Sequence, residues 1–155
     1  MHKMLIIVLF LFLISCSQDQ VYQKYIKIEK QGWHTDSILD FEYNIIDSTC
    51  VYGTQLKIRH TTKYPYQNLF LFISYLSENT PIQIDTIEIF LANKRGAWLG
   101  SGFGEVRETN TALKNNITNS GKYRIKIEQA MRWGKKTRIK NLSEISSVGV
   151  LISKQ

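Results

Sequence analysis

The sequence has few of the features from which an unusual architecture is built. Its 155 residues include only two cysteines, and they contain no internal repeat or low-complexity tract. This composition excludes disulfide-rich scaffolds and repeat proteins. The most apolar stretch, residues 4–15, is shorter than the about 20 residues that a membrane-spanning helix needs. We therefore expect a single domain with its own core behind a short N-terminal segment.

The sequence also lacks the residue patterns of common active sites. His34 and His60 have no metal-ligand spacing, so we expect both to lie at the surface or at a strand edge. Ser101 lies in a glycine-rich stretch that matches neither the hydrolase elbow nor a nucleotide-binding loop. Glu105 and Glu108 form the one candidate carboxylate pair, and a solvated, charge-rich loop explains them better. We predict a protein without catalytic residues, cofactor or metal.

The N-terminus carries an export signal that ends in a cysteine. Lys3 precedes the apolar run, and the sequence Leu-Ile-Ser-Cys occupies residues 13–16. This pattern resembles the lipobox of bacterial lipoproteins, which predicts that Cys16 is lipidated and becomes the first mature residue. The alternative is an ordinary signal peptide with a chance cysteine.

The lipidation hypothesis divides the chain into a signal peptide (residues 1–15), the lipidated cysteine with a short tether (16–20) and one domain (21–155). The tether is polar and reaches roughly 14 Å when fully stretched, so the domain must lie close to the bilayer. With Cys16 lipidated, Cys50 is the only thiol left and no internal disulfide can form. We expect Cys50 to be a small buried apolar residue rather than a reactive one.

The net charge of the chain is positive, at +7. Such a balance suits anionic surfaces, including lipid headgroups, lipopolysaccharide phosphates and acidic polymers. The sequence contains no nucleic-acid-binding motif, and an exported, tethered domain has little access to nucleic acid. We therefore predict a membrane or protein partner and no nucleic acid.

Short strands are predicted along most of the domain. Residues 22–29, 38–45, 82–91 and 148–152 are rich in β-branched and aromatic side chains. Residues 52–58 and 123–127 alternate between apolar and polar positions, as half-buried strands do, whereas residues 69–73 are apolar throughout and predict a central strand covered on both sides. Many short strands that follow one another closely, with little helix, predict an all-β fold. We expect a single-domain β-sandwich, with the jelly roll as one form of it.

Other stretches predict turns and irregular structure. Residues 110–120 are polar and asparagine-rich, which predicts a loop with a helical turn at residues 112–114, and residues 141–144 could start a second helical turn. A change of apolar parity along residues 82–91 predicts a β-bulge near Asp85 and Thr86. The four glycines of residues 96–104 predict a compact turn that packs Trp98 and Phe103 into or beside the sandwich.

Several segments together resemble a known family. They are residues 56–59, 64–69, 91–104, 121–123, 127–132 and 148–150, of which Gly-x-Trp-Leu-Gly at residues 96–100 is the most specific. With the lipobox in front, the chain resembles the gliding-motility lipoprotein GldH family of the Bacteroidetes. The resemblance implies a non-catalytic outer-membrane lipoprotein of the gliding machinery, coupled to type IX secretion, with other envelope proteins of that machinery as partners. Only Asp19 is acidic after the cysteine, which favours the periplasmic side over the cell surface.

Exposed aromatic and basic side chains are the candidate binding residues. Trp33, Trp98 and Trp133 are either core anchors or stacking surfaces for sugar rings, so a glycan-binding envelope lipoprotein is the alternative function. An envelope hydrolase is a third, unsupported by any motif. The basic stretch of residues 135–140 is either a solvated loop or a contact for phosphates or acidic partners. The candidate interaction surface comprises Arg95, Trp98, Lys135, Lys136 and Arg138.

Overall fold

A computed structural model describes residues 20–134 and 137–155 of the chain. In these residues the fold is all-β and contains no helix, as predicted. Accordingly, no helix there is long and apolar enough to span a membrane. Cys16, Lys135 and Lys136 lie outside the described residues, so the lipidation of Cys16 and the roles of Lys135 and Lys136 stay predictions.

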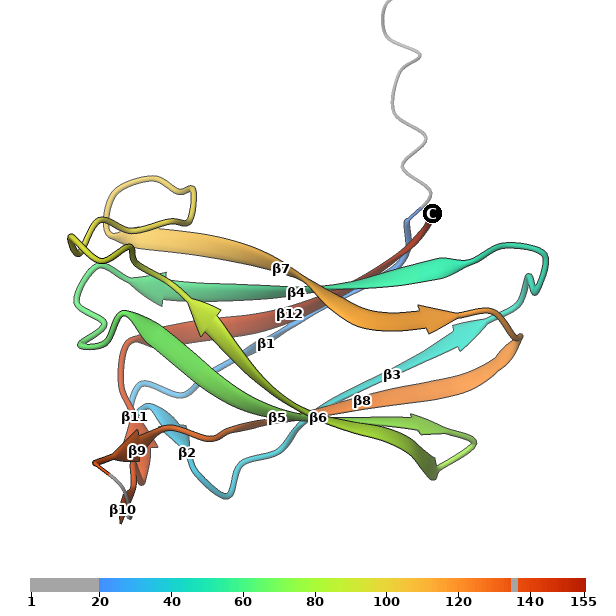
Figure 1. Ribbon diagram of the computed structural model, residues 1–155, viewed down its shortest axis with the longest axis horizontal. Helices are drawn as coiled ribbons and strands as arrows, with labels where there is room; N and C mark the ends of the chain where they lie inside the picture. Colours follow the sequence, from blue (N-terminus) through green and yellow to red (C-terminus); the bar gives the residue numbers. More distant parts are fainter. Residues whose placement is uncertain (1–19, 135–136) are drawn as a thin grey trace, which may run out of the picture.

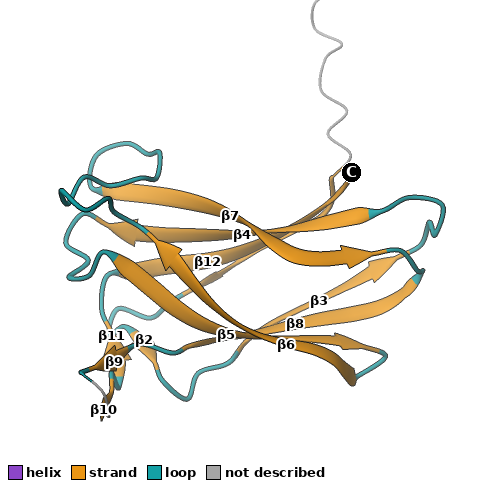
Figure 2. Cartoon of the chain, in the orientation of Figure 1, coloured by secondary structure: helices purple, strands orange, loops and turns teal. Residues whose placement is uncertain are grey.

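Eight long strands form two four-stranded antiparallel sheets that pack face to face (Figures 1 and 2). The first sheet has the order β1-β12-β4-β7 and consists of β1 (Gln20–Lys27), β12 (Ile145–Lys154), β4 (Tyr52–Thr61) and β7 (Val106–Ile117). The second has the order β3-β8-β5-β6 and consists of β3 (Leu39–Ile45), β8 (Gly121–Gln129), β5 (Asn68–Ser77) and β6 (Thr80–Phe90). This division of the strands between the sheets is that of a jelly roll, and the predicted β-sandwich is confirmed.

Two short ribbons close one end of the sandwich. One pairs β2 (Trp33–His34) with β11 (Asn141–Leu142), and the other pairs β9 (Arg132–Trp133) with β10 (Thr137–Arg138). Residues 141–144 therefore begin with a strand and continue into a turn, not the helical turn predicted from the sequence. The second ribbon is tied to the sandwich by Gln129, a buried residue that donates a hydrogen bond to the Ile139 carbonyl.

The core lies between the sheets and follows the alternation in the sequence. In β4 the predicted inward residues Tyr52, Thr54, Leu56 and Ile58 are buried, and in β8 the predicted set at residues 123–127 is buried as well. Side chains that alternate in polarity along a strand present one apolar face, and that face packs against the opposite sheet. The half-buried strands were thus predicted correctly.

The central strand β5 is only partly covered on its outer face. Leu69, Leu71 and Ile73 are fully buried between the sheets, while Phe70 and Phe72 are half-buried on the other side. The segment after β8 pairs with β5, where the Ala130 amide donates to the Phe70 carbonyl, and its residues 130–132 line one groove together with Phe70 and Phe72. The prediction of a strand covered on both sides was therefore right for its position in the sheet and wrong for the extent of its burial.

The parity change in β6 has a different cause from the predicted bulge. Asp85 and Thr86 pair in regular register with β5, and the register shifts near Pro81 instead. Ile82 and Ile84 are simply exposed, at 59% and 69%, on the outer face of the sheet. The apolar residues changed parity because both faces of this edge strand carry isoleucine.

The predicted loop at residues 110–120 is mostly strand. β7 continues to Ile117 and buries Leu113, Asn115 and Ile117. Its register shifts opposite Gly53 and Thr54, and there the buried Asn115 amide oxygen accepts a hydrogen bond of 2.8 Å from the Thr54 hydroxyl. Polar residues are tolerated inside because this bond satisfies both of them.

Candidate interaction surface

The connection between β6 and β7, residues 91–105, forms a rim at one end of the sandwich (Figure 1). A tight turn begins at Asn93, whose side-chain oxygen accepts hydrogen bonds of 2.9 and 3.0 Å from the amides of Arg95 and Ala97. Two isolated β-bridges, Ala92 with Trp98 and Ser101 with Glu108, then fold the connection back on itself. We call residues 91–105 the rim loop.

Two glycines allow the rim loop to approach β7 closely. A Cβ atom at Gly100 would lie 2.5 Å from the Glu108 carbonyl oxygen, and one at Gly102 would lie 2.1 Å from the Val106 carbonyl oxygen. Both distances are far shorter than a normal contact, so a side chain cannot be accommodated without moving the backbone. Gly96 and Gly104 have open space around them. They adopt positive φ angles of +82° and +62°, which favour glycine in a turn.

Trp98 fixes the rim loop to the sandwich. Its ring packs on His60 of β4, with ring centroids 4.7 Å apart, and His60 in turn lies 5.8 Å from the ring of Tyr64. Trp98 is half-buried, which agrees better with an anchor than with an open sugar-stacking surface. The prediction that Trp98 packs beside the sandwich describes this geometry.

His60 is fully buried, so its prediction as a surface or strand-edge residue was wrong. Its Nδ1 lies 2.9 Å from the Thr61 carbonyl oxygen, while the buried Nε2 has no hydrogen-bond partner among the residues that the structure describes. Burial, together with the nearby charge of Arg107, lowers the pKa of His60 below its usual range. The alternation of β4 was an available signal, because the inward parity of Leu56 and Ile58 continues to His60, but the prediction did not extend the pattern that far.

The outer side of the rim loop exposes apolar and basic groups. Phe103 is 98% exposed and Leu99 is 56% exposed, and Arg95 is exposed in the Asn93 turn of the same loop. The prediction that Phe103 packs with the sandwich was therefore wrong. This near-complete exposure makes Phe103 a candidate contact residue.

The other predicted binding residues lie on different elements. Arg138 is exposed in β10, where it pairs with Arg132, and Trp133, 72% exposed, pairs with Thr137 in the same ribbon. Trp33 is buried at 1% exposure and donates its indole N–H to the Ser37 carbonyl at 3.0 Å, so it is a core anchor. The rim loop and the β9–β10 ribbon lie toward the same end of the sandwich, on its two layers (Figure 1).

Sequence reasoning missed an apolar groove on the outer face of the second sheet. Phe70 and Phe72 form its floor, and Tyr66, Met131 and Arg132 are among the residues at its sides. The exposed isoleucines of β6 continue the apolar surface toward the sheet edge. The unbroken apolar run of β5 was the available signal, but it was assigned wholly to the core.

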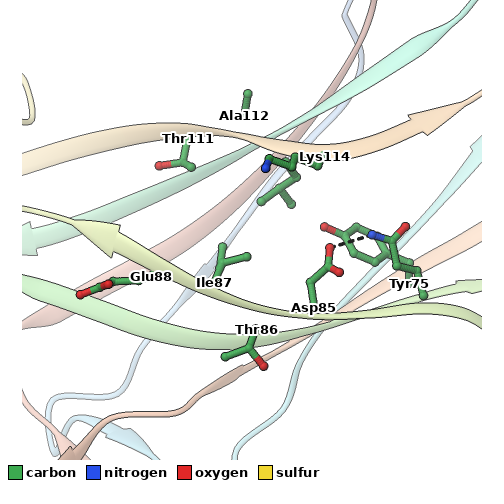
Figure 3. A pocket seen from close by; sticks show the side chains of 10 residues that line it. Tyr75, Asp85, Thr86, Ile87, Glu88, Thr111, Ala112 and Lys114 are labelled. Atoms are coloured by element: carbon green, nitrogen blue, oxygen red, sulfur yellow. Dashed lines mark hydrogen bonds between the residues drawn. The ribbon is translucent and has the colours of Figure 1, made fainter.

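A second hollow lies on the open side of the sandwich, between the edge strands β6 and β7 (Figure 3). Asp85 and Ile87 of β6 face Thr111 and Lys114 of β7 across it, and the Gln83 amide donates a 2.8 Å hydrogen bond to Asp85. An acid and a base on opposite edges give the hollow mixed polarity. Charged groups at a sheet edge also discourage pairing with a further strand.

Glu108 belongs to a network on the outer face of the first sheet and not to a solvated loop. Its carboxylate accepts hydrogen bonds from Arg59 at 2.6 Å and from the Tyr25 hydroxyl at 2.9 Å. Burial acts to raise the pKa of Glu108, but the bonds from Arg59 and Tyr25 outweigh it and hold that pKa below its usual range. Glu105 is separate, exposed and paired with Lys63 at 3.4 Å. The two carboxylates do not form a catalytic pair.

Among the described residues, no group of three or more histidine, cysteine or acidic side chains could hold a metal ion. Ser101 is exposed in the rim loop, where its backbone pairs with Glu108, while His60 lies buried beneath Trp98. His34 is half-exposed beside Asp36. The described geometry offers surfaces for contact and assembles none of the candidate reactive groups into a nucleophile–base pair.

Comparison with known proteins identifies the family. Residues 20–152 match the family described as GldH lipoprotein. The chain belongs to this family. The gliding motility lipoprotein GldH homolog of Christiangramia forsetii is 40% identical over 143 residues, which cover 90% of this chain and 87% of that protein. The gliding motility lipoprotein GldH of Flavobacterium johnsoniae is 32% identical over 146 residues, covering 94% and 91%.

Solved structures resemble the GldH-family domain only distantly. A GH115 glucuronidase with specificity for decorated arabinogalactans aligns with 90% of this chain and 18% of its own, at 12% identity and a TM-score of 0.44. A family 35 carbohydrate-binding module from Clostridium thermocellum covers 86% and 95%, at 14% identity and a TM-score of 0.37. Likeness at this level carries no information about ligands.

Proposed function

We propose that this chain is a lipid-anchored, non-catalytic component of the gliding-motility machinery. The observation that carries the proposal is the family match, which extends over the whole sandwich from β1 to β12. Two relatives that align with about nine-tenths of the chain are named gliding motility lipoproteins. Cys16, at the end of the signal, is the residue that accepts the lipid.

The proposal extends to the cellular setting. The family resemblance supports an outer-membrane location and coupling to type IX secretion. The short tether with Asp19 as its only acidic residue supports the periplasmic side of that membrane. The partners are other envelope proteins of the gliding and secretion machinery.

The mechanism is binding. The lipid fixes the location of the sandwich, and the rim loop docks a partner through Arg95, Leu99 and Phe103, each of which is exposed. Arg138, exposed on the separate β9–β10 ribbon, is a second contact for acidic groups, and Lys135 and Lys136 precede it in the sequence. Trp98 supports the surface from beneath and is held by His60.

Complementation tests the proposal. A Flavobacterium johnsoniae strain that lacks its own GldH is given this chain, and colony spreading and secretion are measured. The wild-type chain should restore both.

The Cys16→Ala variant tests the lipid anchor, and it should leave the protein in the soluble fraction or unprocessed. Each buried methylene of an acyl chain contributes about 0.8 kcal/mol to membrane binding, so loss of the lipid removes the anchor. Normal processing and salt-resistant membrane binding of Cys16→Ala would contradict the lipidation.

Glycan binding is the alternative function, and one observation favours it: Trp133 presents a largely exposed ring on the β9–β10 ribbon. Calorimetry of the purified domain with envelope polysaccharides tests it. Binding that is lost in Trp133→Ala and kept in Trp98→Phe would support the alternative. Capture of secretion or gliding proteins without glycan would support the machine component.

A further inference from the structure

The two termini of the sandwich lie at one end, next to the connection between β3 and β4 (Figure 1). Gln20, the first residue of β1, pairs with Ser153 of β12. The Gln155 amide donates a 2.9 Å hydrogen bond to the Val51 carbonyl in the β3–β4 connection. The tether therefore enters the domain beside residues 46–51.

This end exposes apolar side chains. Ile46 is 85% exposed, and Val21 and Val51 are 42% and 40% exposed. The one acidic group of residues 46–51 is Asp47, whose carboxylate is paired with Lys154 at 3.1 Å. An apolar tip whose acidic group is neutralised meets little repulsion from an anionic membrane surface.

The length of the tether brings this tip to the bilayer. Four peptide units separate Cys16 from Gln20, and they span at most roughly 14 Å. The acyl chains on Cys16 insert into the bilayer and hold this residue at its surface. The domain therefore cannot move far from the headgroups. The rim loop, at the opposite end of the long sandwich, cannot reach the same surface while the termini stay near it (Figure 1).

We infer that the β3–β4 connection is a lipid-contacting tip. Ile46 and Val51 enter the boundary between headgroups and acyl chains, and the sandwich stands on this end with the rim loop directed away from the membrane. The inference rests on the proposed lipidation of Cys16. In this orientation the tip contacts the lipid surface, and the rim loop at the far end remains accessible to the protein partner.

A probe at the tip tests the orientation. In mature lipidated protein Cys16 is blocked, so Cys50→Ser leaves no free thiol, and a single cysteine can be introduced as Ile46→Cys or, as the matched control at the far end, Phe103→Cys. Each is labelled with an environment-sensitive nitrobenzoxadiazole dye and reconstituted into phosphatidylethanolamine–phosphatidylglycerol vesicles. Both sites are exposed, so labelling leaves the core intact.

The dye at position 46 should show blue-shifted emission and strong quenching by brominated lipids, and the dye at position 103 should show neither. Equal, water-like emission from both positions would overturn the orientation. The mass of the N-terminal peptide is measured on the same samples. If it lacks the lipid, the anchoring fails and the orientation fails with it, whereas a lipidated protein with a water-exposed position 46 overturns the orientation alone.

Discussion

Trp98 in the rim loop packs against His60 inside the sandwich, with 4.7 Å between the ring centroids. This contact joins the exposed loop to the core through one side chain. Trp98→Ala should lower the free energy of unfolding by about 1–3 kcal/mol, below the 3–5 kcal/mol of a fully buried tryptophan, because Trp98 is half-buried. Trp98→Phe should retain most of the stability. Urea denaturation of both variants measures the difference, and equal stability of wild type and Trp98→Ala would contradict the anchoring role.

The buried His60 makes stability depend on pH. Its pKa is lowered in the folded state, so below about 6.5, the usual value, the unfolded chain binds more protons than the folded one. The stabilisation is therefore complete above that value and is lost as the pH falls through it toward the folded pKa. Thermal denaturation between pH 8 and pH 5 should show a fall in melting temperature that is reduced in His60→Gln. An unchanged slope in His60→Gln would assign the effect to other groups.

Gly100 should be intolerant of a side chain because of crowding. Its φ is not in the left-handed region, but an added Cβ would lie 2.5 Å from the Glu108 carbonyl oxygen. Gly100→Val should cost on the order of 1–3 kcal/mol and displace the rim loop from β7. Gly104→Ala is the comparison, since it meets no neighbour and carries only the smaller penalty of a positive φ. Chemical denaturation should rank Gly100→Val as the less stable of the two.

The two faces of β5 should differ in sensitivity. Leu71 is fully buried between the sheets, so Leu71→Ala should cost about 2–5 kcal/mol through the cavity that it leaves. Phe72 is half-buried on the outer face, and Phe72→Ala should cost less than a core phenylalanine because solvent can fill the space. Equal losses for the two variants would show that the outer face is covered as fully as the core.

Arg95→Glu separates docking from folding. Arg95 is exposed, and its side chain makes no hydrogen bond or ion pair with the other described residues. The melting temperature should therefore stay within a few degrees, since surface changes rarely exceed about 0.5 kcal/mol. If the rim loop docks an acidic partner, reversal of the charge should reduce colony spreading in the complementation strain. A stable and fully active Arg95→Glu would remove Arg95 from the docking surface.

The sandwich was predictable from the sequence because several of its strands alternate in polarity or run apolar over most of their length. Residues 52–58 and 123–127 show why: each pattern matches one buried face. The prediction failed where the burial of a residue depends on neighbours far along the chain. Nothing local in residues 110–117 reveals that Thr54 satisfies the buried Asn115, and nothing local shows that β6 is an edge strand with isoleucine on both faces.

The candidate site was harder to predict than the fold for the same reason. The glycines of the rim loop predicted a turn. The reason for glycine at residues 100 and 102 is the close approach of β7 backbone carbonyls, which only the structure reveals. The three tryptophans have similar polar or mixed surroundings in sequence, and yet Trp33 is core, Trp98 is an anchor and Trp133 is exposed. Which side chain faces solvent is decided by packing, and sequence neighbours carry little of that information.

The position of β12 between β1 and β4 governs when the protein can fold. The last strand supplies Val148, Val150 and Ile152 to the core and is hydrogen-bonded to the first strand on one side. Until residues 145–154 are in place, β1 has no partner in its sheet among the described strands, and the two sheets cannot bury their shared face completely. The sandwich therefore closes late, once the last strand has paired with both β1 and β4, with the slow kinetics of long-range strand pairing.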